Sequence, residues 1–165
     1  MNLGGEWMMA DVAILGRAAA LGVVAGMRSL AAPAALSRHL AHDPVVPANR
    51  IELLLTHPSA SRVLGLASAV EHVADKLPIV PDRTGPGPLA GRMAVGALCG
   101  AVVARRAGES MAAGAVVGAL AAAAATFAAH ELRRALTVDA GLPDLPIALA
   151  EDVGAIALAE AALRG

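Results

Sequence analysis

The chain has 165 residues and a net charge of −1, and it is 57% hydrophobic and 16% charged. A soluble domain usually carries about 25% charged residues, because polar groups must cover its surface. The composition therefore favours an integral membrane protein over a soluble enzyme, and the near-zero charge provides no basic field that would bind nucleic acid. An alanine-rich soluble bundle is the alternative, since alanine is only weakly apolar.

The first apolar segment predicts a helix from about Val12 to Leu40, which is long enough to cross about 30 Å of hydrocarbon. Arg28 lies deep in this segment, and Pro33 removes a backbone donor. We therefore expect the helix to kink or break just after Arg28. The residues before Val12 contain no Lys or Arg, unlike the start of a cleavable signal peptide, so we expect the segment to be retained.

The middle of the chain predicts short helices between proline-rich loops. Residues 42–58 contain three prolines and are expected to form an extramembrane loop, with a short interfacial helix at 49–55. The helix expected at 59–77 ends in charged residues and is either a short span or a re-entrant helix. Residues 78–88 contain four prolines, which predict a stiff connector.

The second half of the chain predicts three more helices, at about 89–104, 110–136 and 145–163. The stretch 111–129 carries no charge and is the clearest membrane span. Residues 1–165 are therefore expected to form one all-α membrane domain. It would be a bundle of about five short helices that crosses the cytoplasmic (inner) membrane several times.

Glycines four residues apart recur in three of the apolar segments. Such pairs let helix backbones approach closely in lipid, where dispersion forces drive packing. The sequence therefore predicts tight helix contacts at Gly22 and Gly26, at Gly96 and Gly100, and at Gly114 and Gly118.

A short internal similarity raises the alternative of a repeat. Residues 22–26 resemble 114–118, and residues 70–74 resemble 150–154. This would relate the first and second predicted helices to the fourth and fifth. With five spans the second copy would be inverted, as in many transporters. Chance similarity explains the match equally well in a chain so rich in Ala, Gly and Val.

Charged residues within the apolar segments form the candidate intramembrane site. A charge at the middle of a span costs about 2.5–3.5 kcal/mol, so it is normally paired or faces a polar cavity. One interpretation is that an arginine neutralises some of the acids while others bind a proton or cation. The charges could instead form closed ion pairs that lock the helices, or lie partly at the interface. The residues are Arg28, Glu71, Asp75, Glu151 and Asp152.

A second group of charges surrounds the proline-rich connector. Its arginines and a helix N-terminus could hold an anion such as phosphate or a lipid headgroup, or its charges could pair in a rigid turn. The residues of this predicted loop site are Lys76, Asp82, Arg83, Thr84 and Arg92. No His/Cys spacing matches a metal site, and no cofactor motif is present. An enzyme acting on lipid would need a nucleophile or metal that the sequence does not identify.

Several short motifs together resemble a known family. They are Gly-Met-Arg-Ser at 26–29, Ala-Pro-Ala at 32–34, Ala-Asp-Lys-Leu-Pro at 74–78, Pro-Asp-Arg-Thr at 81–84, Gly-Arg at 91–92 and Glu-Asp at 151–152. They resemble the bacterial membrane family described as domain of unknown function DUF4126, over nearly the whole chain. The resemblance implies a small multi-helix membrane protein and supplies no substrate. The most specific part of the resemblance is the segment from Asp75 to Arg92, which implies that this segment is more than a simple turn.

The leading hypothesis from the sequence is a transporter- or channel-like protein that handles an ion or small solute at the polar intramembrane site. The alternative is a structural or accessory membrane protein that assembles through its Gly-xxx-Gly helix faces. The expected partners are the lipid bilayer and an ion or small solute or, under the alternative, a second copy of the chain.

Overall fold

A computed structural model describes residues 3–74 and 84–164, which form seven α-helices and one π-helical turn and contain no strand. The predicted all-α fold is confirmed over these residues. The helices are α1 (Leu3–Met27), α2 (Ala31–Leu40), α3 (Arg50–Thr56), α4 (Pro58–Ala74), α5 (Pro86–Arg106), α6 (Met111–Arg134) and α7 (Asp144–Arg164), and the π-helical turn η1 (Ala135–Asp139) follows α6.

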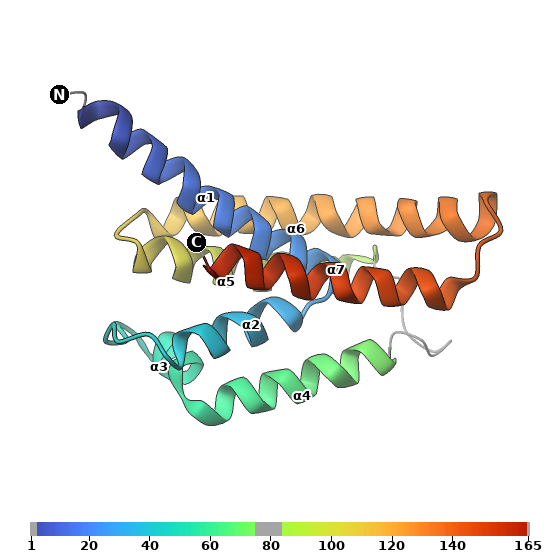
Figure 1. The fold of residues 1–165 in the computed structure, drawn as a ribbon, viewed down its shortest axis with the longest axis horizontal. Helices are drawn as coiled ribbons and strands as arrows, with labels where there is room; N and C mark the ends of the chain where they lie inside the picture. The colour runs from blue at the N-terminus through green and yellow to red at the C-terminus, as the bar shows by residue number, and fades with distance from the viewer. Residues whose placement is uncertain (1–2, 75–83, 165) are drawn as a thin grey trace.

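The tightest group of helices is α1, α5 and α6. α2 and α7 pack against α1, and α4 lies outermost against α2 (Figure 1). Small buried side chains, among them Ala25, Cys99 and Ala122, fill the centre between these helices. Because such residues add little bulk, the helix axes can approach closely.

Glycines make the closest helix contacts. A Cβ atom at Gly22 or at Gly96 would overlap the backbone carbonyl of Gly118, so α1 and α5 both approach α6 at this residue. Backbone cannot move aside as a flexible side chain can, so these positions require glycine. A Cβ atom at any glycine of the predicted pairs would overlap a backbone carbonyl oxygen of a neighbouring helix. These glycines are Gly22, Gly26, Gly96, Gly100, Gly114 and Gly118.

The first predicted helix is broken at residues 28–30, where the sequence predicts a kink or break. α1 ends at Met27, and α2 begins at Ala31 and runs back toward the end of the molecule from which α1 came (Figure 1). Pro33 lies in the first turn of α2, where a missing N–H costs no helical hydrogen bond. The expected count of about five helices is not confirmed, because this break and α3 add separate helices.

The helix directions do not support an inverted repeat. Gly22 of α1 faces Gly118 of α6, and Gly26, one turn later, faces Ala122, one turn after Gly118. α1 and α6 are therefore parallel. An inverted repeat that relates the first predicted helix to the fourth would make them antiparallel, so the predicted repeat is not confirmed.

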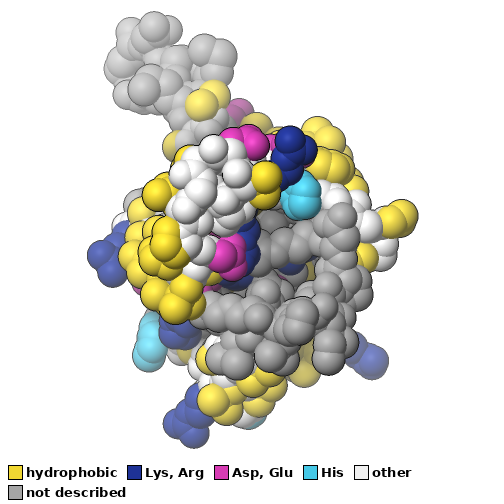
Figure 2. All heavy atoms as spheres, turned by 90° about the vertical axis from the view of Figure 1, so that its right-hand side faces the viewer, with side chains coloured by type: hydrophobic (Ala, Val, Ile, Leu, Met, Phe, Trp, Pro, Cys, Tyr) yellow, Lys and Arg dark blue, Asp and Glu magenta, His cyan; other side chains and the backbone are white. Residues whose placement is uncertain are grey.

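Two helical stretches are long and apolar enough to cross a membrane, Pro86–Arg106 and Met111–Asp139. In the most apolar 18 residues of each stretch, 33% and 28% of the residues are buried, so the majority keep some exposed surface. One or two such helices are weak evidence by themselves, since core helices of soluble proteins can also meet these criteria. Seen from the end where α6 joins α7, hydrophobic side chains cover much of the described perimeter, and acidic and basic side chains meet near the middle (Figure 2).

Candidate functional site

The break between α1 and α2 frees backbone groups that a continuous helix would pair. In such a helix the N–H groups of Ser29 and Leu30 would donate to carbonyls one turn earlier, and the carbonyls of Gly26 and Met27 would accept from residues 30 and 31. Buried backbone groups need other partners when these bonds are lost. Here charged side chains from two distant helices bind the two broken ends.

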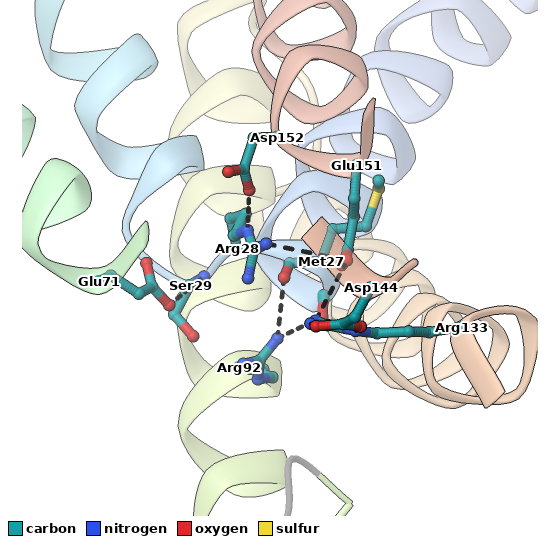
Figure 3. Close-up of polar contacts among 10 residues, drawn as sticks. Met27, Arg28, Ser29, Glu71, Arg92, Arg133, Asp144, Glu151 and Asp152 are labelled. Atoms are coloured by element: carbon teal, nitrogen blue, oxygen red, sulfur yellow. Dashed lines mark hydrogen bonds and ion pairs between the residues drawn. The ribbon is translucent and has the colours of Figure 1, made fainter. Parts of the chain in front are cut away.

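Glu71 of α4 binds the α2 end of the break. Its Oε1 accepts a hydrogen bond from the Ser29 N–H and its Oε2 accepts one from the Leu30 N–H, both at 2.8 Å (Figure 3). A carboxylate at this place also interacts favourably with the positive end of the helix dipole. Glu71 therefore does for α2 what an N-cap side chain does elsewhere, although it lies about 40 residues further along the chain.

Arg92 of α5 binds the α1 end of the break. Its Nη1 donates to the carbonyl oxygens of Gly26 at 2.5 Å and Met27 at 3.2 Å, and the Thr126 hydroxyl also donates to Gly26 at 3.2 Å. The sequence predicts Arg92 in the loop anion site, but the structure buries it in the bundle, with 5% of its surface exposed. The reason is that Arg92 lies one turn before Gly96, on the face of α5 that packs inward.

Arg28 lies within the break and is fully buried. Its Nε donates to Oδ1 of Asp152 on α7 at 2.5 Å, and its Nη2 lies 3.8 Å from Oε2 of Glu151 (Figure 3). A buried arginine requires such partners, because its charge is otherwise unbalanced in a low-dielectric interior. Four of the five residues predicted for the intramembrane site thus meet around one helix break: Arg28, Glu71, Glu151 and Asp152.

The cluster extends to Arg133 and Asp144, which were not predicted from the sequence. Arg133, in the last turn of α6, donates to both carboxylate oxygens of Asp144 at 2.7 and 2.6 Å, and its Nη1 lies 3.9 Å from Glu151 Oε2. Asp144 is the first residue of α7, where an acid is favoured by the helix dipole. One signal for this pair was present in the sequence, because Arg133 and Asp144 lie on either side of the short connection between α6 and α7.

An apolar groove opens beside the charged cluster. In the described helices α7 makes its main contacts with α1 and α2, and a groove of about 800 Å³ lies between α6 and α7. Ala125 and Ala128 of α6 and Ile147 of α7 line its wall, and Arg133 and Glu151 lie at its polar part. Glu151 therefore faces both the buried arginine and the open groove.

The remaining predicted site residues are not brought into this cluster. Asp75, Lys76, Asp82 and Arg83 lie outside the described residues, so the loop anion site stays a prediction. Thr84 lies two residues before α5 and is partly exposed. Over the part of the chain that the structure describes, no group of three His, Cys, Asp or Glu side chains could hold a metal ion.

A second buried acid, also not predicted, lies at the other end of the bundle. Glu52 of α3 is fully buried and accepts hydrogen bonds from Nε and Nη2 of Arg105, in the last turn of α5. The side chain of Asn49 caps α3 by accepting from the Glu52 N–H at 2.9 Å. The Asn-x-x-Glu spacing is a helix-start signal, and it could have identified Glu52 as more than a surface charge.

The family model described as Domain of unknown function (DUF4126) matches residues 15–164. The matched range contains every residue of the cluster around Arg28, including Glu71, Arg92 and Glu151. Neither a curated protein nor a solved structure matches the chain. Any function must therefore be argued from the geometry of the site.

Proposed function

The chain belongs to the DUF4126 family, and we propose that it is a small transporter- or channel-like membrane protein that moves a proton or small cation past a polar site in the bilayer. The observation that carries this proposal is the broken helix at Arg28, whose two ends and whose arginine are held by charged side chains from α4, α5 and α7. Broken helices are a common binding element of secondary transporters, because their ends present backbone groups to ions and substrates.

The outer surface supports the proposed position in the cytoplasmic membrane, with several crossings. At 1.5 Å per residue, α5 and α6 are about 32 and 36 Å long, close to the ~30 Å thickness of the hydrocarbon layer. Large apolar side chains also project outward from other helices: Leu66 of α4 is 70% exposed and Val153 of α7 is 66% exposed. Extended apolar surface is unfavourable in water and favourable against lipid tails.

Glu151 is the residue that we propose takes part in ion movement. It lies at ion-pair distance from Arg28 and from Arg133, and it also lines the groove between α6 and α7. A carboxylate at the boundary between arginines and an open groove can exchange an arginine partner for a proton or a cation. Asp152 is only 7% exposed and binds Arg28 directly, so we assign it the role of holding that arginine.

Assembly through the Gly-xxx-Gly faces is the second candidate. The three glycine pairs already pack against backbone within one chain, so these faces are occupied. A partner would have to bind another surface, for example the exposed apolar face of α4. The geometry therefore favours transport over assembly.

Ion flux into proteoliposomes tests the proposal. Vesicles that contain the purified protein and a pH-sensitive dye are given a potassium gradient with valinomycin, and the rate of proton entry is measured. Sodium and potassium entry are measured with matching dyes in vesicles without valinomycin, because valinomycin itself carries potassium. We expect the wild type to conduct one of these ions faster than empty vesicles do, and we expect Glu151→Gln to lose most of that rate because its amide cannot carry the charge.

Glu160→Gln is the matched control. It makes the same change on the same helix, but Glu160 is exposed and pairs with Arg38 at 2.8 Å, away from the cluster. Its flux should equal that of the wild type. Wild-type rates no faster than those of empty vesicles for all three ions, or an unchanged rate in Glu151→Gln, would contradict the proposed function.

A further inference from the structure

The short helix α3 buries a carboxylate and exposes leucines. It lies at the end of the bundle where α2 ends and α4 begins (Figure 1). Glu52 is fully buried, whereas Leu53 and Leu54 are 61% and 68% exposed. A helix on the surface of a soluble domain usually turns its apolar face inward and its charges outward. The outer face of α3 has the opposite character, so it is suited to an environment less polar than water.

Polar contacts hold α3 in this orientation. Glu52 accepts hydrogen bonds from the guanidinium of Arg105, in the last turn of α5. On the same side of α3, the Ser37 hydroxyl of α2 donates to the Leu55 carbonyl at 2.6 Å. A rotation of α3 that turned its exposed leucines inward would leave the buried carboxylate without its partner, which is strongly unfavourable. The leucines therefore project outward from a helix that is fixed to the bundle.

The loop before α3 adds to the exposed apolar surface. Val46 is 80% exposed, and Arg106 Nη1 holds the neighbouring Val45 to α5 by donating to its carbonyl at 3.2 Å. Single exposed apolar side chains are ordinary, but a group of large ones marks a binding or membrane-contacting surface. We call this group the α3 patch. Its members are Val45, Val46, Ile51, Leu53 and Leu54.

The charged side chains exposed beside the α3 patch are basic. Arg50 is the first residue of α3, Arg62 lies in the second turn of α4, and both are exposed. Residues 42–63 also contain two acids, Asp43 and Glu52, but these pair with the two arginines at the end of α5. This segment therefore presents apolar side chains together with positive charge, a combination that is complementary to an anionic lipid surface.

The contacts with α5 also determine the level of the α3 patch. α5 is one of the two helical stretches long and apolar enough to cross a membrane, and the arginines that bind Glu52 and the Val45 carbonyl lie in its last turn. If α5 crosses the bilayer as proposed above, α3 lies where that helix leaves the hydrocarbon layer. Anionic lipid headgroups lie at this level and attract exposed arginines.

We propose that the α3 patch binds anionic phospholipids. Its apolar side chains enter the boundary between headgroups and acyl chains, and Arg50 and Arg62 contact lipid phosphates. The charges favour this occupant over a second copy of the chain, because a symmetric dimer would bring the same patch, with its arginines, against itself. The inference rests on the proposed membrane position and does not depend on ion movement.

Quenching of a single tryptophan by brominated lipids tests the proposal. Leu54→Trp places an indole in the α3 patch, and Trp7→Phe removes the only native tryptophan. The full chain is reconstituted in vesicles of one fixed mixture of phosphatidylcholine and phosphatidylglycerol. Either the phosphatidylglycerol or an equal amount of the phosphatidylcholine carries bromine. We expect brominated phosphatidylglycerol to quench more, with a local enrichment of roughly fivefold, as one arginine near an anionic surface implies.

Matched variants assign this preference to the two arginines. Arg50→Gln combined with Arg62→Gln should make the two brominated lipids quench Leu54→Trp equally, and high salt should weaken the preference in the same way. Arg134→Gln removes an exposed positive charge at the end of α6 and should keep the preference. A second reporter, Leu120→Trp, lies near the middle of α6 on its exposed side and should be quenched equally by both lipids.

Equal quenching of Leu54→Trp by the two brominated lipids would overturn the proposal, and so would a preference that survives the loss of both arginines. A Leu54→Trp reporter that neither lipid quenches, beside a quenched Leu120→Trp, would also overturn it, because the patch would then face water or a second copy. If neither reporter is quenched, the membrane position fails and the proposal fails with it. Ion flux is not measured here, so loss of transport alone leaves these outcomes unchanged.

Discussion

Arg28 has no exposed surface, so groups inside the protein must balance its charge. Its direct partner is Asp152, at 2.5 Å. We expect Arg28→Gln to lower the free energy of unfolding by about 3–5 kcal/mol, because Asp152 would remain as a buried charge without its main counter-charge. Unfolding of the purified protein by heat or SDS in detergent measures the loss.

A variant that removes both charges distinguishes the free-energy cost of an unpaired buried charge from the cost of lost packing. The double variant Arg28→Gln/Asp152→Asn keeps two side chains that can hydrogen-bond, so it should recover a large part of the stability lost in Arg28→Gln. The exposed pair of Arg38 and Glu160 is the control, and Arg38→Gln should change stability by less than about 1 kcal/mol. Wild-type stability in Arg28→Gln would show that this pair does not organise the helix break.

The sequence identifies the charged residues that lie within apolar segments, but it does not show which of them pair with one another. An arginine within one apolar segment and acids within others are visible from hydropathy alone. Glu151 and Asp152 are adjacent, however, and which of them meets Arg28 depends on the rotation of α7. Asp152 faces inward because it shares a helix face with the buried residues Ala148, Ala155 and Ala159. This row of alanines on one face of α7 is hard to recognise from the sequence, because the other faces of the helix are also largely apolar.

Among the helices, Gly118 is the position where three of them come closest. Gly118→Ala would place a Cβ against the Gly96 backbone of α5, which cannot move aside without separating the helices. We expect this variant to lower the free energy of unfolding by about 1–3 kcal/mol through overpacking. The melting temperature in detergent provides the measurement.

Gly154→Ala is the matched control for Gly118→Ala. Gly154 is also within a helix, α7, but no atom lies within contact distance of a Cβ built there. Alanine should be neutral at this position or add up to about 1 kcal/mol, since it restricts the unfolded chain and favours the helix. Equal effects of the two substitutions would be inconsistent with a tight contact between α5 and α6.

The existence of the helices could be predicted more fully than their directions. The uncharged run of α6 and the Asn49 cap of α3 are local signals, and Pro33 with Arg28 marks the break. The direction of a helix depends on how many times the chain has reversed before it, and a reversal at a short helix changes the direction as fully as one at a long helix. The break makes α2 run back along α1 and so adds one reversal (Figure 1). Every later helix is thereby inverted relative to a five-span arrangement, which is why α1 and α6 are parallel.

For the whole molecule, this extra reversal brings the two ends of the chain to the same end of the bundle. α1 begins and α7 ends on one side in Figure 1, and the loop after η1 lies on the other side. If the bundle crosses the membrane as proposed, both termini must face the same compartment. A five-span arrangement would instead place them in opposite compartments.

Reporter fusions decide between these two arrangements. A fluorescent protein that matures only in the cytoplasm and an enzyme that is active only outside it are fused in turn to each terminus and inserted at the exposed Gly141. We expect both termini to give one result and Gly141 the opposite one, with the unfused protein remaining in membranes after alkaline carbonate extraction. Opposite results at the two termini would contradict the helix directions. Recovery of the chain in the carbonate supernatant would contradict the membrane location, because the exposed apolar faces of α4, α6 and α7 would then have to be stable in water.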